Sequence, residues 1–217
     1  MTSLDVSANT SLEVLSCYNN QLTSLDLRNG NNMNMCGSCD TYVHFTKFPY
    51  HDPDLWVQCY DINTTEIDRT YEHFLELPYN IGILTNLEVL YLKGTDFAYP
   101  EMPESIGDLV NLRILDLRYS ELGGPIPESI GNLVNLEELI LYNNLLQSND
   151  GFTSIPNTIG NLINLKEFDI GRNRLTSLPE SIGNLTSLEK LKVNDNYLTS
   201  LPESLCDLPV DCHIRVY

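Results

Sequence analysis

The hydrophobic positions of this chain recur at a nearly constant interval over its C-terminal two thirds. Apolar residues occupy the first, fourth and sixth positions of a six-residue block that begins at Leu87, Leu112, Leu136, Leu165 and Leu188. The successive steps are 25, 24, 29 and 23 residues. A second block, Pro-x-x-Ile-Gly-x-Leu in its fullest form, keeps the same rhythm. Its copies span 103–109, 127–133, 156–162, 179–185 and 202–208, and a degenerate copy spans 78–84. Self-similarity at such a period is the signature of a stacked repeat architecture.

The spacing within one repeat predicts its local structure. The fourth and sixth positions alternate with an exposed residue, which is the period of a short strand with one buried face. Asn144, Asn173 and Asn196 follow three of the strands at the same offset, where an interior amide can bond the backbone at a turn. Proline then stops strand pairing, and the Ile-Gly-x-Leu stretch returns the chain along the outer side. One repeat cannot bury its leucines alone, whereas a stack can, so the pattern predicts an α/β solenoid.

The segment 165–185 closely matches Leu-x-x-Leu-x-Leu-x-x-Asn-x-Leu-x-x-Leu-Pro-x-x-Ile-Gly-Asn-Leu and resembles the leucine-rich-repeat family. The resemblance is strong over residues 77–217. It implies a right-handed superhelix with a concave parallel β-sheet and a convex side of short helices and extended chain. The segment 123–127 is similar to repeats of plant-type extracellular receptors, and 175–179 is closer to bacterial and intracellular forms.

The N-terminal part has a shorter form of the pattern. Residues 12–27 resemble the 21-residue repeats of secreted or surface proteins from Bacteroidetes-type bacteria. In that form 15–17 is the concave strand, and 4–6 and 25–27 lie on the opposite wall. Residues 52–59 are interpreted as a further diverged strand, followed by a convex-side helix within 64–75.

We therefore expect a single domain over 1–217 with three parts. Residues 1–27 carry short repeats, 28–76 form an irregular cysteine- and aromatic-rich repeat with an insertion, and 77–217 carry regular repeats. The last strand pattern, 214–216, falls 23 residues after 191–193 and leaves no sequence for a polar cap, which solenoids usually need. We interpret this as truncation; the alternative is an open end that packs on a partner.

Charge excludes two classes of ligand. Thirty acidic against twelve basic side chains give a formal charge of −18. Binding to a nucleic-acid backbone or to an anionic membrane surface depends on Lys and Arg, so neither is expected. The chain has no apolar run long enough for a transmembrane helix, and its first residues show no signal peptide.

The exposed strand positions of a solenoid align as columns, and these columns contain the candidate binding residues. The column between the two buried strand residues includes Tyr91, Asp116, Ile140, Asp169 and Lys192. The next two columns add Lys93, Arg118, Tyr142, Tyr119 and Arg172. Tyr and Arg on a rigid sheet are typical of interface hot spots. The outer blocks carry Glu104, Glu128, Glu180 and Glu203, so the outer wall is expected to be acidic.

Two strand-following positions depart from the family pattern, because Thr95 and Ser120 replace the usual asparagine. A hydroxyl can satisfy fewer backbone groups than an amide, which could loosen these turns or be a neutral variation.

The cysteines leave several alternatives open. Cys206 and Cys212 resemble the C-terminal capping cysteines of secreted family members, which implies a disulfide and an oxidising compartment. Cys36, Cys39 and Cys59, with His44 or His51, suggest a zinc site, but a second closely spaced cysteine pair is missing and the histidine spacing is irregular. For these three cysteines a disulfide is favoured first, free thiols second and zinc last, so no metal or cofactor is predicted.

Catalytic motifs are not found: the chain has no Gly-x-Ser-x-Gly, phosphate loop or His-Glu-x-x-His, and we expect no enzyme. The first hypothesis is a protein–protein recognition module that binds on the concave strand face. The alternatives are a carbohydrate- or cell-wall-binding module using the concave tyrosines, and the substrate-recognition arm of a larger enzyme. The resemblance favours a secreted or cell-surface location, with the cytoplasm as the alternative.

Overall fold

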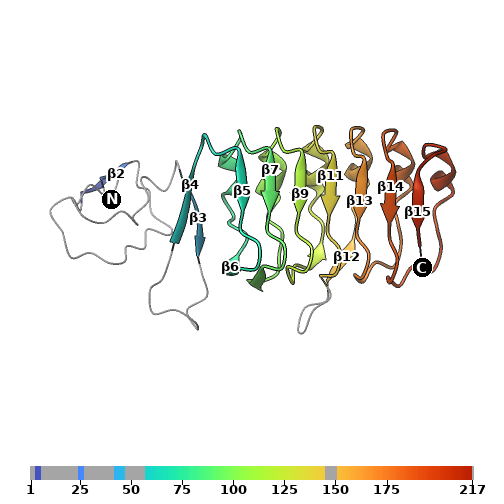
Figure 1. Cartoon of the computed structure of the whole chain (residues 1–217), viewed down its shortest axis with the longest axis horizontal. Helices are drawn as coiled ribbons and strands as arrows, with labels where there is room; N and C mark the ends of the chain where they lie inside the picture. Colours follow the sequence, from blue (N-terminus) through green and yellow to red (C-terminus); the bar gives the residue numbers. More distant parts are fainter. Residues whose placement is uncertain (1–2, 6–23, 27–41, 47–56, 145–150, 217) are drawn as a thin grey trace.

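The computed structural model describes residues 3–5, 24–26, 42–46, 57–144 and 151–216. Residues 66–144 and 151–216 form a row of stacked coils (Figure 1). Each coil contributes one strand to a seven-stranded parallel sheet with the order β15-β14-β13-β11-β9-β7-β5. In chain order these strands are β5 (Glu66–Asp68), β7 (Val89–Tyr91), β9 (Ile114–Asp116), β11 (Glu138–Ile140), β13 (Glu167–Asp169), β14 (Lys190–Lys192) and β15 (His213–Arg215). The predicted solenoid is therefore confirmed.

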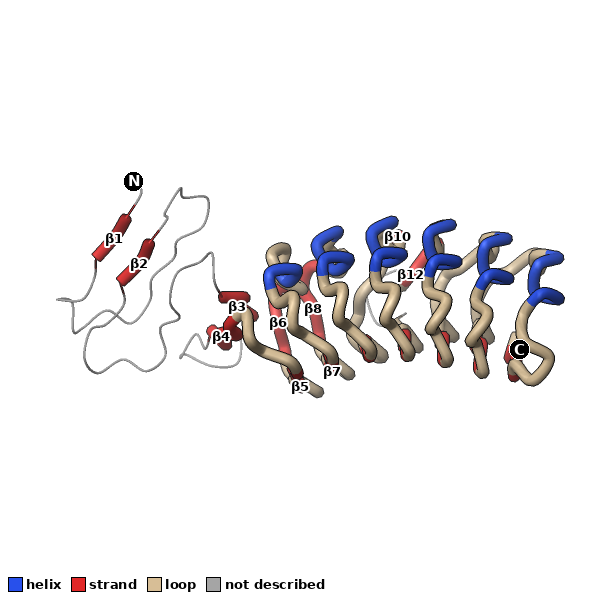
Figure 2. The backbone as a smooth tube through the Cα atoms, turned by 90° about the horizontal axis from the view of Figure 1, so that it is seen from above, coloured by secondary structure: helices blue, strands red, loops and turns tan. Residues whose placement is uncertain are grey.

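Short 3₁₀ helices form the opposite wall of the coils (Figure 2). They are η1 (Ile81–Ile83), η2 (Glu104–Asp108), η3 (Glu128–Asn132), η4 (Asn157–Asn161), η5 (Glu180–Asn184) and η6 (Glu203–Asp207). The proline of each Pro-x-x-Ile-Gly block is the N-cap residue of η2 to η6. Its fixed φ and missing N–H end the extended segment and suit the first turn of a helix.

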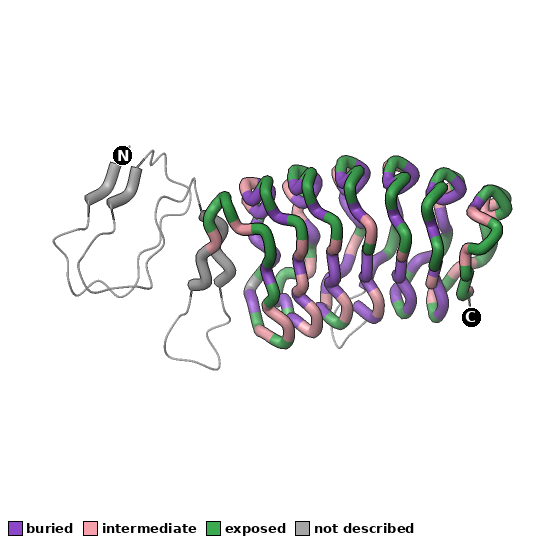
Figure 3. Tube along the Cα trace, turned by 45° about the horizontal axis from the view of Figure 1, so that its top comes forward, coloured by how far each residue is buried: buried purple, intermediate pink, exposed green. Residues whose placement is uncertain are grey.

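The core lies between these two walls (Figure 3). The middle residue of each strand points into it, and along the sheet these residues form one row. Ile67, Leu90, Leu115, Leu139, Phe168 and Leu191 are at most 1% exposed. The isoleucine and leucines of the helix blocks close the core from the other side. Stacking thus buries what a single coil would leave in water, as the sequence pattern requires.

Smaller sheets flank the main one. β6 (His73–Glu76) pairs in parallel with β8 (Asp96–Tyr99), and β10 (Gly124–Pro125) pairs with β12 (Phe152–Ser154). They lie in the segments that lead from the main strands back to the helices. Near the N-terminus β1 (Ser3–Asp5) pairs in parallel with β2 (Ser24–Asp26). The segment 15–17, expected to be a strand, lies outside the described residues.

Two expectations for the irregular part are corrected. No helix forms within 64–75, because Ile67 continues the core row and the segment supplies β5 and β6 instead. Residues 57–61 do form a strand, β4 (Val57–Asp61), as the pattern of 52–59 suggested. It pairs antiparallel with β3 (Tyr42–Thr46), however, and does not join the seven-stranded sheet.

Candidate functional site

The strand pairing places the candidate residues in the columns that the repeat period predicts. The third residues of the strands align across the sheet as Asp68, Tyr91, Asp116, Ile140, Asp169, Lys192 and Arg215. Backbone hydrogen bonds continue the alignment beyond the strands, for example from the Gly94 N–H to the Arg118 carbonyl and from the Tyr119 N–H to the Tyr142 carbonyl. The register read from the sequence is thus confirmed, and β5 extends it by one coil.

Three residues of this column are buried, although they were expected to be exposed for contact with a partner. Asp116, Ile140 and Asp169 are only 6%, 3% and 7% exposed, although they lie on the solvent side of the sheet. The expectation that the column is uniformly exposed is therefore wrong. Tyr91 and Lys192 are half-buried in the same column.

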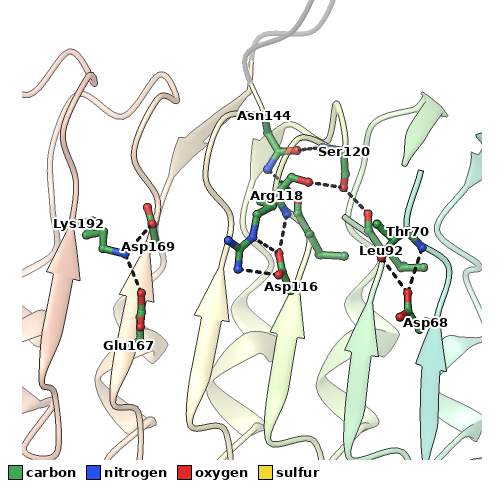
Figure 4. Close-up of polar contacts among 11 residues, drawn as sticks. Asp68, Thr70, Leu92, Asp116, Arg118, Ser120, Asn144, Glu167, Asp169 and Lys192 are labelled. Atoms are coloured by element: carbon green, nitrogen blue, oxygen red, sulfur yellow. Dashed lines mark hydrogen bonds and ion pairs between the residues drawn. The ribbon is translucent and has the colours of Figure 1, made fainter. Parts of the chain in front are cut away.

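The two aspartates serve the fold itself. Asp116 Oδ1 accepts hydrogen bonds from the Arg118 backbone N–H at 3.1 Å and from Arg118 Nε at 2.8 Å, and Asp116 Oδ2 lies 2.7 Å from Arg118 Nη2 (Figure 4). Asp169 Oδ1 accepts the Gly171 N–H at 3.2 Å, and Asp68 makes the same bond to Thr70. Each carboxylate thus satisfies a backbone donor two residues on, where its strand ends.

Lys192 is also engaged within the sheet. Its Nζ lies 2.7 Å from Glu167 Oε1 and 3.2 Å from Asp169 Oδ2, across the β13–β14 pair (Figure 4). Burial opposes the charged forms, but the hydrogen bonds outweigh it, so the pKa of Glu167 is lowered and that of Lys192 is raised.

The turn that follows each strand has a distinctive backbone. Tyr71, Gly94, Tyr119, Asn143, Arg172 and Asp195 occupy equivalent positions, and all have φ between 53° and 65°. Glycine, asparagine and aspartate tolerate this left-handed region, whereas a tyrosine or arginine there is strained. Strained residues of this kind cluster at functional sites, so Tyr71, Tyr119 and Arg172 are candidates for a role beyond folding.

The side chains at and next to these turns make two sets of contacts, one around Tyr119 and one around Tyr71. The rings of Tyr119 and Tyr142 meet edge to face, with centroids 5.5 Å apart at 85°. Tyr142 lies over Gly171, because a Cβ there would come within 3.2 Å of its ring. The Tyr71 ring similarly covers Gly94, and Lys93 Nζ lies 5.7 Å from its centroid.

We call the surface formed by these turns the aromatic rim; it consists of Tyr71, Lys93, Arg118, Tyr119, Tyr142 and Arg172. Arg172 is exposed and forms no ion pair with any described residue. Tyr71, which is 68% exposed, could not be found from the leucine pattern, because β5 contains no leucine. A signal was present: Ile67 precedes Leu90 by 23 residues, a step that also occurs elsewhere in the chain.

Beneath the rim, buried side chains hold neighbouring coils together. Asn144 Oδ1 accepts the N–H groups of Ser120 and Leu122, and its Nδ2 donates to the carbonyls of Leu117 and Leu141. Ser120, which replaces an asparagine, still donates through Oγ to the Leu92 carbonyl at 2.6 Å. Thr95 donates likewise to the Arg69 carbonyl. Each hydroxyl therefore retains the bond to the preceding coil.

The expected disulfide is not present. Cys206 and Cys212 are both free thiols, the first exposed and the second half-buried, and burial raises the pKa of Cys212. Among the residues that the structure describes, no His, Cys, Asp and Glu side chains are grouped so as to hold a metal ion. Strand pairing sets His44 opposite Cys59, while Cys36, Cys39 and His51 lie outside the described residues.

Fold and surface together define a repeat solenoid that displays a rigid parallel sheet with an aromatic and cationic edge. A family model described as Leucine Rich Repeat matches residues 111–133, 164–185 and 187–208. The chain belongs to the leucine-rich-repeat family. In the described part of the chain, no helix has the length and apolar character needed to cross a membrane.

Solved structures of the same fold come from bacteria and plants. A leucine-rich-repeat protein of Leptospira interrogans is 30% identical, with a TM-score of 0.57 over 67% of this chain and 35% of that one. The plant peptide hormone receptor RGFR1, in complex with RGF2, is 30% identical, with a TM-score of 0.62 over 73% and 25%. The ectodomain of the Arabidopsis receptor kinase HAESA, in complex with an IDA peptide hormone ligand, is 25% identical, with a TM-score of 0.56 over 69% and 25%.

This chain therefore spans between a quarter and about a third of the length of those structures. No curated protein sequence matches it.

Proposed function

We propose that this chain is a recognition domain that binds a protein partner through the strand face and its aromatic rim. The observation that carries the proposal is the Tyr119–Tyr142 pair beside Arg172, an exposed cation without an ion pair among the described residues. Tyr and Arg dominate the energetics of protein interfaces because they present large, rigid contact areas and several donors. The backbone strain at Tyr119 and Arg172 also fits a surface shaped for contact.

The structural neighbours support the same class of function. RGFR1 and HAESA are described in complex with peptide ligands, and both share this fold. By analogy we infer an extracellular setting for this chain, with an extended peptide or a protein loop as its ligand. A bacterial source remains a prediction, which rests on the short N-terminal repeats.

The strand-face residues differ in how much of each side chain a partner could contact. Asp116, Asp169 and Lys192 are engaged within the fold and Ile140 is buried, so they shape the surface from beneath. Tyr91 stays accessible, and burial together with nearby Glu138 and Glu66 raises the pKa of its phenol. Its hydroxyl therefore remains a neutral hydrogen-bond donor for a partner.

The test is selection of binding peptides from a random display library, followed by affinity measurements with variants. Peptides selected on the wild-type chain should bind Tyr142→Ala and Arg172→Glu at least about tenfold more weakly, which corresponds to one hot-spot contact each. Tyr79→Ala is the matched control, because Tyr79 is 70% exposed but lies beside η1 on the helix wall.

Selected peptides that bind both rim variants as tightly as the wild type would overturn the rim as the binding surface. A glycan array run in parallel tests the carbohydrate alternative: sugar binding lost in Tyr91→Ala and Tyr142→Ala, without peptide binding, would replace the proposal.

A further inference from the structure

A second surface lies at the other end of the strands, where the chain rises from each helix toward the sheet. A groove of about 480 Å³ lies there, lined by two residues from each of three central coils and by Glu88 and Ser187 of the coils on either side. Its lining includes Asn111, Asn135, Asn164, Arg113, Glu137 and Lys166. Arg113 precedes Arg118 by five residues, so the groove and the aromatic rim are separated by roughly 16 Å along an extended chain. The groove is thus distinct from the proposed partner site.

One row of the groove consists of amides. Asn111, Asn135 and Asn164 each donate through Nδ2 at 2.8 Å to a backbone carbonyl of the preceding coil. These bonds fix the orientation of each amide. The side-chain oxygen of each accepts no hydrogen bond from the described residues, so the groove presents one oriented acceptor per coil.

A second row consists of charges that neutralise one another. Glu137 Oε1 lies 2.7 Å from Arg113 Nη2, and Glu137 Oε2 lies 2.5 Å from Lys166 Nζ. These hydrogen bonds lower the pKa of Glu137, so the carboxylate stays ionised between its two cations. Glu88 and Glu189 continue the alternation of sign on the outer coils. Because the charges are paired, the row suits an uncharged ligand rich in hydroxyls better than an anion.

A third row, apolar and exposed, adjoins the groove in sequence but is not part of its lining. Val110, Val134 and Ile163 directly precede the three asparagines and are 45%, 45% and 53% exposed. The coils on either side have threonine at the same position, Thr85 and Thr186. A hydroxyl-bearing residue is therefore compatible with the fold here. Aliphatic side chains occur only in the coils that line the centre of the groove.

We propose that this groove binds a linear, uncharged polysaccharide, with about one sugar ring per coil. The coils repeat at about 4.8 Å, the spacing of neighbouring strands, which is close to the length of one hexose in an extended β-linked chain. The apolar C–H faces of the rings would rest on the aliphatic row. Their hydroxyls would donate to the asparagine oxygens and exchange bonds with the paired charges. A regular polymer is thus matched to a regular surface, independently of the partner proposed for the aromatic rim.

The experiment is calorimetric titration of the whole chain with β-linked glucose oligosaccharides and with β-linked N-acetylglucosamine oligosaccharides of increasing length. The affinity for one series should rise by about tenfold from the monosaccharide to the trisaccharide and then level off, because only three coils carry all three rows. The triple variant Val110→Thr, Val134→Thr, Ile163→Thr should lose at least about tenfold in affinity.

Two controls separate this site from the rim and from general surface effects. Val210→Thr changes a fully exposed valine outside the groove and should leave sugar binding unchanged, as should Arg172→Glu. If the triple variant unfolds at a lower temperature than the wild type, Ile163→Thr alone takes its place. The proposal is overturned if neither series binds, if affinity does not depend on length, or if the threonine variant binds as the wild type does.

Discussion

Asn144 and Ser120 occupy equivalent positions in neighbouring coils. Both side chains form hydrogen bonds with backbone groups, but they differ in the number of bonds they make. The Asn144 amide makes four hydrogen bonds to backbone groups, whereas Ser120 Oγ makes a short bond to Leu92 and a long one to Arg118 within its own turn. Both are completely buried. Buried backbone groups need partners, so the cost of losing either side chain depends on how many partners disappear with it.

Asn144→Ala should therefore lower the free energy of unfolding by on the order of 3 kcal/mol, because four buried backbone groups lose a partner. Urea unfolding followed by circular dichroism measures this. Asn132→Ala, at an exposed helix position, is the control and should change stability little. Equal losses in the two variants would show that the buried amide has no special role.

At the scale of elements, neighbouring 3₁₀ helices pack through the same glycine contact in one coil after another. On the helix wall the glycine of each Ile-Gly pair faces the serine or threonine of the next coil. A Cβ on Gly131 would lie 2.5 Å from the Thr158 backbone oxygen and from Thr158 Cβ. The glycines thus set the distance between helices. The repeat preserves them for packing, since Gly131 is not among the residues with positive φ.

Gly131→Ala should cost roughly 1–3 kcal/mol of stability, because overpacking forces the two helices apart. Gly124→Ala is an informative comparison: a Cβ there meets nothing within 4 Å, but φ is +78°. Its cost should be about 1 kcal/mol, from backbone strain alone. Thermal unfolding of both variants would show whether packing or backbone freedom matters at Gly131. A melting temperature unchanged in Gly131→Ala would rule out the packing explanation.

On the strand wall, the β13–β14 pair contains an ion cluster with a definite pH dependence. The pKa of Glu167 is lowered from 4.5 in the folded chain, since the hydrogen bonds from Lys192 and Lys190 outweigh burial. A lowered acid pKa means that its stabilisation is present above about pH 4.5 and is lost as the pH falls through the folded value. Glu167→Gln should therefore flatten the acid limb of a stability–pH curve measured by urea unfolding. Glu203→Gln, on the helix wall, is the matched control, and an acid limb unchanged in Glu167→Gln would contradict the assignment.

Across the whole molecule, residues of the same core row contribute differently to stability, depending on their place along the solenoid. Leu139 is completely buried in the middle of the core row, whereas Ile214, in the same row of β15, is 41% exposed. A stack stabilises each coil through its two neighbours, so the last strand of the sheet has only one side packed.

Leu139→Ala should cost about 3–5 kcal/mol, and Ile214→Ala about 1 kcal/mol or less, because only the first leaves an enclosed cavity. Equilibrium unfolding in urea compares the two directly. Similar losses at both positions would mean that the coils do not differ in stability along the row.

Much of this architecture could be predicted from the sequence because a solenoid is close to one-dimensional. The positions of Leu90, Leu115 and Leu139 determine the strand register, and the register alone places Tyr91 and Tyr142 on the same face. Prediction failed at β5, where Glu66, Ile67 and Asp68 contain no leucine. The 23-residue step from Ile67 to Leu90 is a weak signal without a leucine, and the backbone pairing of the two residues establishes that coil.

The sequence by itself determined the fold family, the columns and their order, since each follows from the spacing of apolar residues. The tertiary structure decided which column residues remain available, because burial depends on side chains from the same turn and from adjacent coils. Asp116 is covered by Arg118, and Asp169 by Lys192, whereas Arg172 stays exposed. It also brought the amide and charge rows into one groove, because residues more than twenty positions apart become neighbours only when the coils stack.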